Sequence, residues 1–260
     1  MGSSFENVSV DGNTICIYRM KNQYCVSDFI RAMQKAIRYT NRKTVEDKRI
    51  FVDCTTVIGR VFPDACVPIA ALIQEYRNLY SLEIYVTVKK RSYLEKICFE
   101  SPLNLNEDEI ISACDPFDRI YIYESKDGGS PQAAAINQAI VNKLSSTALC
   151  EEGVLKGLNW CVYEVMDNVL IHSTSKHGYI MAQYHNKTNR IAIRIYDYGI
   201  GIHDSLITGG VYEDDEIKSI ELALQEGIGD GQGQGNGLFG LSQIVSENGG
   251  RLAISTGNQR

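Results

Sequence analysis

Three polar side chains in the second half of the sequence stand four residues apart on one predicted helix. Residues 157–171 carry apolar side chains at helical spacing, and Glu164, Asn168 and His172 follow at i, i+4 and i+8. A carboxylate one turn before a carboxamide can hold a hydrated Mg²⁺ ion and orient a water molecule, because Mg²⁺ prefers oxygen ligands and keeps several waters. An exposed polar helix face has the same spacing, so this motif alone leaves both interpretations open.

An aspartate and two glycines follow a predicted strand. Residues 190–196 alternate isoleucine with other side chains, as strands do, and Asp197, Gly199 and Gly201 come directly after them. A carboxylate at a strand end can accept a hydrogen bond from an exocyclic amine, and glycines let a flat ring lie against the backbone. A strand that simply ends in a glycine turn has the same pattern.

A glycine-rich segment, residues 229–240, leads into a predicted helix that stops at residues 248–250. Free N–H groups at the start of a helix can bind an anion, and the helix dipole adds to the attraction. The segment lacks the Gly-Lys-Ser/Thr of a Walker A loop, and Asn and Gln separate its glycines, unlike those of a Rossmann fingerprint. A flexible linker has a similar composition. Fourteen of the 22 glycines lie between Gly199 and Gly257.

In this order the motifs resemble the GHKL superfamily of ATP-binding domains, which includes gyrase and the histidine kinases and has the Bergerat fold. Residues 164–168 are similar to its N box, residues 197–202 to its G1 box and residues 233–238 to its G2 box. Residues 249–254 are similar to the strand that follows the G2 helix. The resemblance covers residues 152–256 and implies a C-terminal Bergerat-fold α/β sandwich.

The resemblance also implies a role for each matching residue. Asn168 would coordinate a Mg²⁺ ion that bridges the phosphates of ATP, Asp197 would accept the adenine amino group, and Glu164 would be the general base for the hydrolytic water. Residues 203–236 would form a lid that closes over the nucleotide, with a short helix at 216–226. The residues that would hold the base and the phosphates are Gly199, Gly201, Gly233, Gly235, Asn236, Gly237 and Leu238.

Predicted strands and helices alternate in the first half, which indicates a sheet with helices packed on it. The strands are expected at residues 13–18, 49–54, 83–88 and 119–123, and the helices at residues 26–39, 65–79 and 92–99. A stretch of Gly, Ser and Pro at 125–131 is typical of a linker between two regions of a chain. We therefore expect an α/β protein of the α+β kind with two domains, residues 1–127 and residues 132–260.

The order of the first half resembles STAS-like (anti-sigma-factor-antagonist-like) domains. In that family a strand leads to an Asp-Ser-Ser/Thr-Gly turn that opens a helix and carries a regulatory phosphorylated serine. Residues 50–54 match the strand, but Asp64, Ala65 and Cys66 occupy the place of the turn. Because no hydroxyl group stands there, the phosphorylation switch does not carry over. A generic α/β domain that positions another part of the protein is the alternative interpretation.

Composition limits the classes of partner. The net charge of −6 disfavours nucleic acid, which requires a basic stripe. No apolar run approaches the roughly 18 residues of a membrane helix, and no signal peptide pattern is present. The eight cysteines have neither metal-binding nor redox spacing, and most lie in apolar stretches. We therefore expect reduced core thiols in a cytoplasmic protein that binds neither nucleic acid nor membrane.

The sequence thus predicts a Mg²⁺-dependent ATP-binding protein of the GHKL class, a slow ATPase whose lid closure regulates a protein partner or the N-terminal domain. Two alternatives stay open: an anti-sigma-factor-type Ser/Thr protein kinase, and a nucleotide-gated interaction module without enzymatic activity. The helix predicted at 132–149 contains no phosphoacceptor histidine. Because the family usually has further strands after the G2 helix, we expect either a short sheet or a chain that continues beyond Arg260. A homodimer is left open.

Overall fold

The computed structural model describes residues 3–42, 48–113, 115–126, 129–148, 153–211, 215–228 and 237–257. A five-stranded sheet comes first in the chain and a three-stranded sheet second, each with helices packed on it, so the predicted α+β class is confirmed. In the first sheet the strands are β1 (Ser3–Ser4), β2 (Val8–Asp11), β3 (Thr14–Ile17), β4 (Arg49–Asp53) and β5 (Glu83–Thr87). In the second they are β6 (Tyr121–Glu124), β7 (His177–His185) and β8 (Arg190–Asp197).

The first sheet has the order β1-β2-β3-β4-β5, in which β3, β4 and β5 run parallel. The crossover helices α1 (Gln23–Arg42) and α2 (Pro63–Tyr80) pack on one face of this sheet. Burial alternates along β4 and β5, because only that face is covered. On the other face the rings of Phe51 and Tyr85 stack with their centroids 5.6 Å apart and remain partly in solvent.

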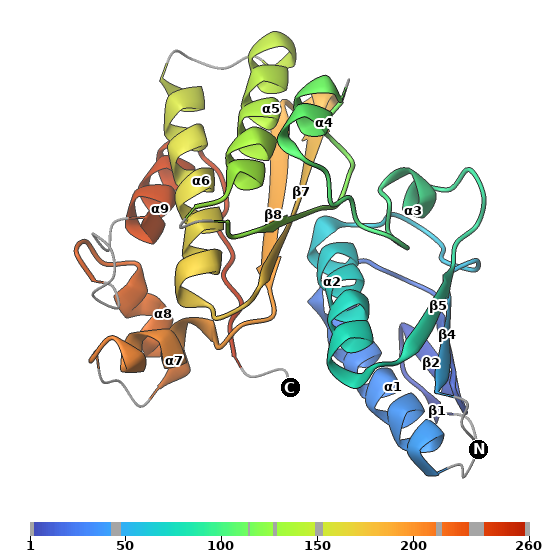
Figure 1. The fold of residues 1–260 in the computed structure, drawn as a ribbon. Helices are drawn as coiled ribbons and strands as arrows, with labels where there is room; N and C mark the ends of the chain where they lie inside the picture. Colours follow the sequence, from blue (N-terminus) through green and yellow to red (C-terminus); the bar gives the residue numbers. More distant parts are fainter. Residues whose placement is uncertain are drawn as a thin grey trace.

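Helix α2 lies between the two sheets (Figure 1). Every residue from Ala65 to Ile73 is buried, as expected for a helix with apolar neighbours on all sides. One side of α2 packs on the first sheet, and the other contacts β7 and β8; the Sγ of Cys66, for example, lies 3.9 Å from the Sδ of Met181. Tyr179 and Met181 of β7 therefore belong to the hydrophobic core of the first sheet.

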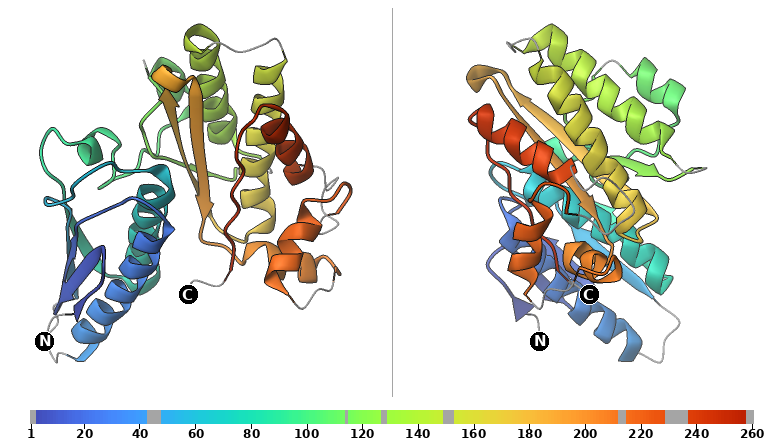
Figure 2. Two further views of the ribbon diagram at one scale, coloured as in Figure 1. Left: turned by 180° about the vertical axis from the view of Figure 1, so that it is seen from behind. Right: turned by 90° about the vertical axis from the view of Figure 1, so that its left-hand side faces the viewer.

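The second sheet is antiparallel with the order β6-β7-β8. Helices α5 (Pro131–Thr147) and α6 (Val154–His172) cover the face that points away from α2. The molecule is thus layered as sheet, α2, sheet and helices, and α9 (Gly237–Glu247) lies against α6 (Figure 2). The remaining helical segments are α3 (Tyr93–Lys96), α4 (Glu107–Ser112), η1 (Asn186–Thr188), α7 (Gly201–Thr208) and α8 (Glu216–Ala223).

Polar contacts join α2 to the second sheet at the start of β7. The hydroxyl of Tyr179 donates to the Oε1 of Glu75 at 3.1 Å. His177 stands between two carboxylates, 3.7 Å from Glu75 on α2 and 3.7 Å from Glu124 on β6. Its pKa is raised, chiefly by the contact with Glu75. A protonated His177 therefore links the two layers electrostatically.

Two sequence expectations differ from the structure. The strand expected at 119–123 forms as β6, but it pairs with β7 and so lies in the second sheet. Local alternation predicts a strand without specifying its partner, which depends on distant residues. The prediction of a strand at 249–254 was wrong. Helix α9 ends at Glu247, the chain turns at Gly249, whose φ is +61°, and residues 251–256 are not hydrogen-bonded into a sheet. Among the described residues, no helix combines the length and apolar character that crossing a bilayer requires.

Candidate functional site

Helix α9 begins against the polar side of α6. Gly237, its first residue, is buried, and a Cβ placed there would lie 3.2 Å from the Cβ of Glu164 and 3.3 Å from the Nδ2 of Asn168. The first N–H groups of a helix have no intrahelical partner and carry its positive dipole end. The fold thus places a carboxylate and a carboxamide beside a helix N-terminus.

Close glycine contacts fix this arrangement. A Cβ on Gly240 would lie 2.5 Å from the Cζ3 of Trp160, and a Cβ on Gly157 would lie 2.8 Å from the Cδ1 of Ile244. Because residue 157 meets residue 244 whereas residue 164 meets residue 237, α6 and α9 run antiparallel. The absence of side chains on these glycines lets the two helices approach closely, and this approach determines where α9 starts.

Asp197 ends β8 and its side chain folds back onto the turn that follows. The Oδ1 of Asp197 accepts a hydrogen bond from the Gly199 N–H at 2.8 Å. Burial raises the pKa of this carboxyl, while hydrogen bonding from the Gly199 N–H and from the Ser173 side chain opposes the rise. The result is an acceptor held in one orientation by the backbone, as recognition of an amine requires.

Gly199 has no room for a side chain. A Cβ there would lie 2.1 Å from the carbonyl oxygen of Ser173, and the same oxygen accepts the Ile200 N–H at 2.8 Å. Ser173 directly follows α6; its Oγ is in contact with the Val169 carbonyl and accepts from the Ser175 N–H. Sequence reasoning missed Ser173, although a small polar residue just after the N-box helix is a signal that could have drawn attention to it.

The second glycine of the turn is tied to the C-terminal segment. Gly201 adopts a φ of +82°, and a Cβ there would lie 2.6 Å from the Oγ1 of Thr256, which accepts the Ile202 N–H at 2.9 Å. Thr256 was also missed, since nothing local indicates a contact across 54 residues. The start of the predicted lid forms α7, and His203 on α7 hydrogen-bonds to Ser219 on α8 at 2.9 Å.

The glycine-rich loop is described only in part. Gly237 and Leu238 begin α9, and Leu238 is partly buried. Gly233, Gly235 and Asn236 lie outside the described residues. The described parts of the three predicted motifs therefore meet in two places. The first is the contact between α6 and α9, and the second is the end of β8, where the turn packs on Ser173 directly after α6.

The donor set suits a magnesium ion that keeps most of its ligands as water and phosphate. Glu164 and Asn168 offer carboxylate and amide oxygens beside the start of α9, and Mg²⁺ commonly takes only one or two such protein ligands. Among the described residues, no group of three or more His, Cys, Asp and Glu side chains could form a metal site. A dedicated cage of that kind is not what the resemblance implies.

Cys66, one of the residues that stand where the STAS resemblance expects the phosphorylated turn, lies within the packed interior. Cys66 is fully buried at the start of α2, and burial raises the pKa of its thiol far above the usual value. A thiol kept protonated in the core is a poor nucleophile, so Cys66 does not substitute for the absent serine.

Comparison with models of protein families, with curated proteins and with solved structures returned no match. Functional assignment therefore depends on the residues and their geometry.

Proposed function

We propose that the second half of the chain binds ATP together with Mg²⁺ and hydrolyses it slowly. The contact between the first residue of α9 and the Glu164–Asn168 face of α6 carries this proposal. It brings N–H groups, a carboxylate and a carboxamide to one place, and phosphates bind readily at such helix N-termini. The partly buried acceptor Asp197, which would take the adenine amine, supports it from the turn that packs on Ser173, the residue after α6.

Each residue has a defined task in this proposal. Asp197 accepts the exocyclic amine, and the turn at Gly199 and Gly201 leaves the base free to lie against the backbone. Asn168 holds the magnesium ion, which neutralises phosphate charge when it is bound. Glu164 removes a proton from the attacking water, the task of a general base placed beside the phosphates.

The layering of the molecule supports the proposal that the nucleotide site regulates the N-terminal part of the chain. The end of β8 carries Asp197, and the same strand packs against α2, which is also part of the first core. Closure of α7 and α8 over a nucleotide would bear on β8 through the turn at Gly199. A displacement there reaches α2 without any flexible linker, because close-packed interiors transmit strain.

Calorimetric titration of the full chain with ATP in Mg²⁺ buffer tests the binding step. Asp197→Asn keeps the size of the side chain but removes its charge, so we expect affinity to fall roughly 10- to 100-fold. Asp204→Asn is the matched control, because Asp204 is exposed on α7. Absence of nucleotide binding by the unaltered protein, or equal affinities for the protein and Asp197→Asn, would refute the proposal.

Hydrolysis is tested separately with γ-labelled ATP. Glu164→Gln should retain nucleotide affinity and lose phosphate release by at least about 100-fold, because the amide cannot accept a proton from water. Transfer of the label to a protein substrate instead of release as free phosphate would favour the kinase alternative. Binding without turnover in the unaltered protein would favour the nucleotide-gated interaction module.

A further inference from the structure

A hollow lies beside the first sheet, far along the chain from the proposed ATP site. Its volume is about 620 Å³, within the usual range of small-molecule sites. The residues that line it are Arg19, Lys21, Ile58, Gly59, Arg60 and Phe62. They come from the segments that follow β3 and β4.

The topology favours a binding site at this place. Strands β3 and β4 are parallel neighbours, and their carboxyl ends open onto the same edge of the sheet. Two backbone bonds join the segments that follow them: the Ile58 N–H donates to the Tyr18 carbonyl at 2.9 Å, and the Phe62 N–H donates to the Met20 carbonyl at 3.1 Å. Loops held in place by a rigid sheet are where binding residues are most often found.

The hollow is positively charged. Arg19, Lys21 and Arg60 are exposed, and none of them has an ion pair or a side-chain hydrogen bond within the part of the chain that the structure describes. Asp and Glu are missing from the described residues that line the hollow. The nearby carboxylate of Asp53 is engaged in its own loop, where Oδ1 accepts the Thr55 N–H at 2.8 Å. Three unneutralised cations around one hollow attract an anion.

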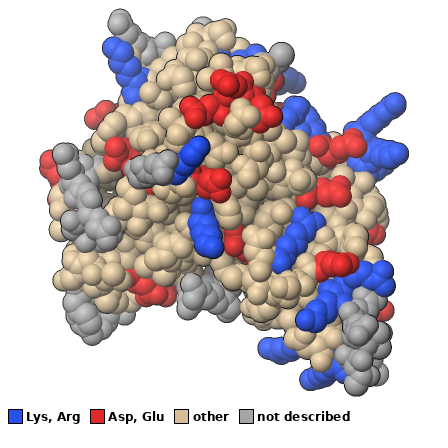
Figure 3. All heavy atoms as spheres, viewed as in Figure 1, with Lys and Arg blue, Asp and Glu red and all other residues tan. Residues whose placement is uncertain are grey.

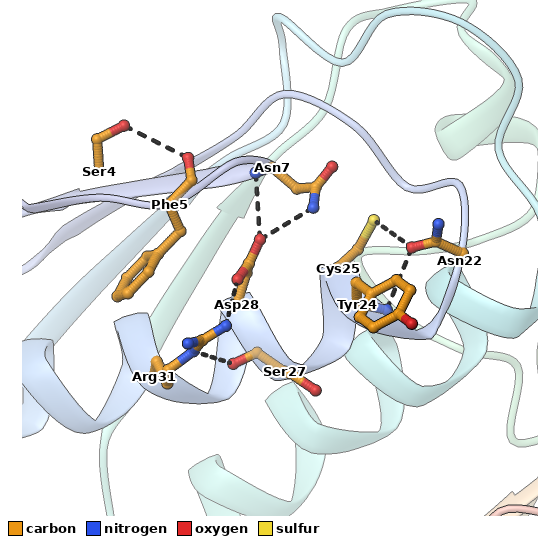
Figure 4. A network of polar contacts seen from close by, with 9 residues as sticks. All are labelled: Ser4, Phe5, Asn7, Asn22, Tyr24, Cys25, Ser27, Asp28 and Arg31. Carbon is orange, nitrogen blue, oxygen red and sulfur yellow. Dashed lines mark hydrogen bonds and ion pairs between the residues drawn. The ribbon is translucent and has the colours of Figure 1, made fainter.

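Both crossover helices begin beside this hollow. Helix α1 starts two residues after Lys21, where the Asn22 side chain accepts the Tyr24 N–H at 3.1 Å (Figure 4), and its first turn contains no acidic residue. Helix α2 starts directly after Phe62, and the acidic residue of its first turn, Asp64, is exposed outside the lining. The dipoles of two long helices therefore add to the positive potential of the side chains.

An apolar surface lies next to the cations. Ile58 is 63% exposed, and Phe62 is half-buried on the same lining. When a ligand covers an exposed aliphatic side chain beside an aromatic ring, the apolar surface leaves water and binding becomes more favourable. The hollow thus offers charge for a phosphate and an apolar surface for a ring or short chain.

We propose that this hollow binds a small organic phosphate, with the phosphate on Arg19 and Arg60 and its apolar part on Ile58 and Phe62. Arginine suits this task, because its guanidinium group can donate two parallel hydrogen bonds to phosphate oxygens. The site is separate from the proposed ATP site, since none of its lining residues lies in the second half of the chain.

Calorimetric titration with phenyl phosphate tests the site. The full chain is used in low-salt buffer with EDTA, so that Mg²⁺-dependent nucleotide binding does not contribute. We expect a Kd below about 1 mM, weakened roughly tenfold by Arg19→Gln or Arg60→Gln and lost in the double variant. Arg38→Gln removes the same charge about 22 Å along α1 and should leave affinity unchanged.

A second substitution tests the apolar half. Ile58→Ser should weaken phenyl phosphate several-fold while leaving the weak affinity for inorganic phosphate unchanged. Thermal unfolding of each variant establishes that it folds, and exposed side chains of this kind seldom affect stability. Equal binding by the protein and the Arg19→Gln, Arg60→Gln double variant would overturn the proposal, and so would an equal loss in Arg38→Gln. Absence of phenyl phosphate binding by the unaltered protein would also overturn it.

Discussion

The two candidate binding regions both lie where strands end and helices begin, but they offer positive potential in different ways. In the first domain it comes from Arg19, Lys21 and Arg60 on exposed segments. At the start of α9 it comes from backbone N–H groups, in a half of the chain that carries 9 basic and 14 acidic residues. Figure 3 shows one face of the molecule, on which many Lys and Arg side chains lie over the first sheet and its helices.

This difference determines what each region can tolerate. Side-chain cations act over several ångströms and adjust their position, so such a site depends on charge and on salt. Backbone donors must be placed by packing. The proposed ATP site therefore depends on glycines at which even the methyl group of an alanine would not fit. Gly199 and Gly237 illustrate the second case, since both stand within van der Waals reach of side chains or backbone that the site needs.

The largest effect is expected from Gly199→Ala. Its Cβ would lie 2.1 Å from the Ser173 carbonyl oxygen and 2.7 Å from the Oδ1 of Asp197, so backbone must move. We expect the free energy of unfolding to fall by about 3 kcal/mol and ATP binding to be lost. Urea unfolding and titration with ATP measure both, and Gly129→Ala, which meets nothing within 4 Å, is the control.

The matching change in the basic hollow should be mild. A Cβ on Gly59 meets nothing within 4 Å, so Gly59→Ala incurs only the strain of a φ of +83°, about 1 kcal/mol. We expect the affinity for phenyl phosphate to change less than about threefold. If Gly59→Ala were as damaging as Gly199→Ala, the contrast between a charge-built and a packing-built site would fail.

Salt should separate the two regions next. Raising KCl from about 50 mM to about 500 mM should weaken phenyl phosphate binding about tenfold, because the three cations are exposed and ions screen them. The affinity for Mg²⁺–ATP should fall by a smaller factor. Part of that affinity would come from the hydrogen bond between Asp197 and the uncharged adenine amine, which salt screens little. Titrations at both salt concentrations provide the comparison, and equal factors would contradict it.

The smallest effect concerns His177, which lies between α2 and the second sheet. Glu75 and Glu124 raise its folded pKa, while burial and Lys176 oppose the rise. Its stabilising contribution is therefore complete below the unfolded value of about 6.5 and is lost as pH rises through the folded value. The effect should be under about 1 kcal/mol, because the ring is partly exposed.

Urea unfolding at pH 5.5 and 8.5 measures this contribution. His177→Gln should remove the part of the pH dependence that falls between those values, while leaving stability at pH 8.5 nearly unchanged. An unaltered pH profile in the variant would show that His177 does not link α2 to the second sheet.

Much of the fold could be predicted because local periodicity specifies local structure. The strands at 49–54 and 83–88 and the helix at 157–171 formed close to their expected bounds. Strand β7 was not predicted, because it is buried along most of its length and so lacks the alternation of a half-exposed strand. The apolar run at residues 65–73 of α2 was visible in the sequence, and such a run indicates a helix segment covered on all sides.

The candidate site could be predicted only where its chemistry lies in a motif. Glu164, Asn168 and Asp197 carry recognisable spacing, and their resemblance to a known family supplied the roles. Ser173 and Thr256 could not be found in this way, because what they do depends on contacts with the turn after β8. The sequence also contained the three cations of the basic hollow, but Arg60 stands about 40 residues after Arg19 and Lys21. The three come together only when β3 pairs with β4.

The packing of Trp160 on Gly240 makes the α6–α9 contact optically accessible. Trp160 is the single tryptophan of the sequence, and its ring is 45% exposed while its buried edge lies on α9. Indole emission depends strongly on hydration, so any separation of α9 from α6 would shift the spectrum of the whole protein without an added label. The unmodified chain therefore carries its own fluorophore at the helix whose start would receive the phosphates, and rapid mixing could time that movement directly.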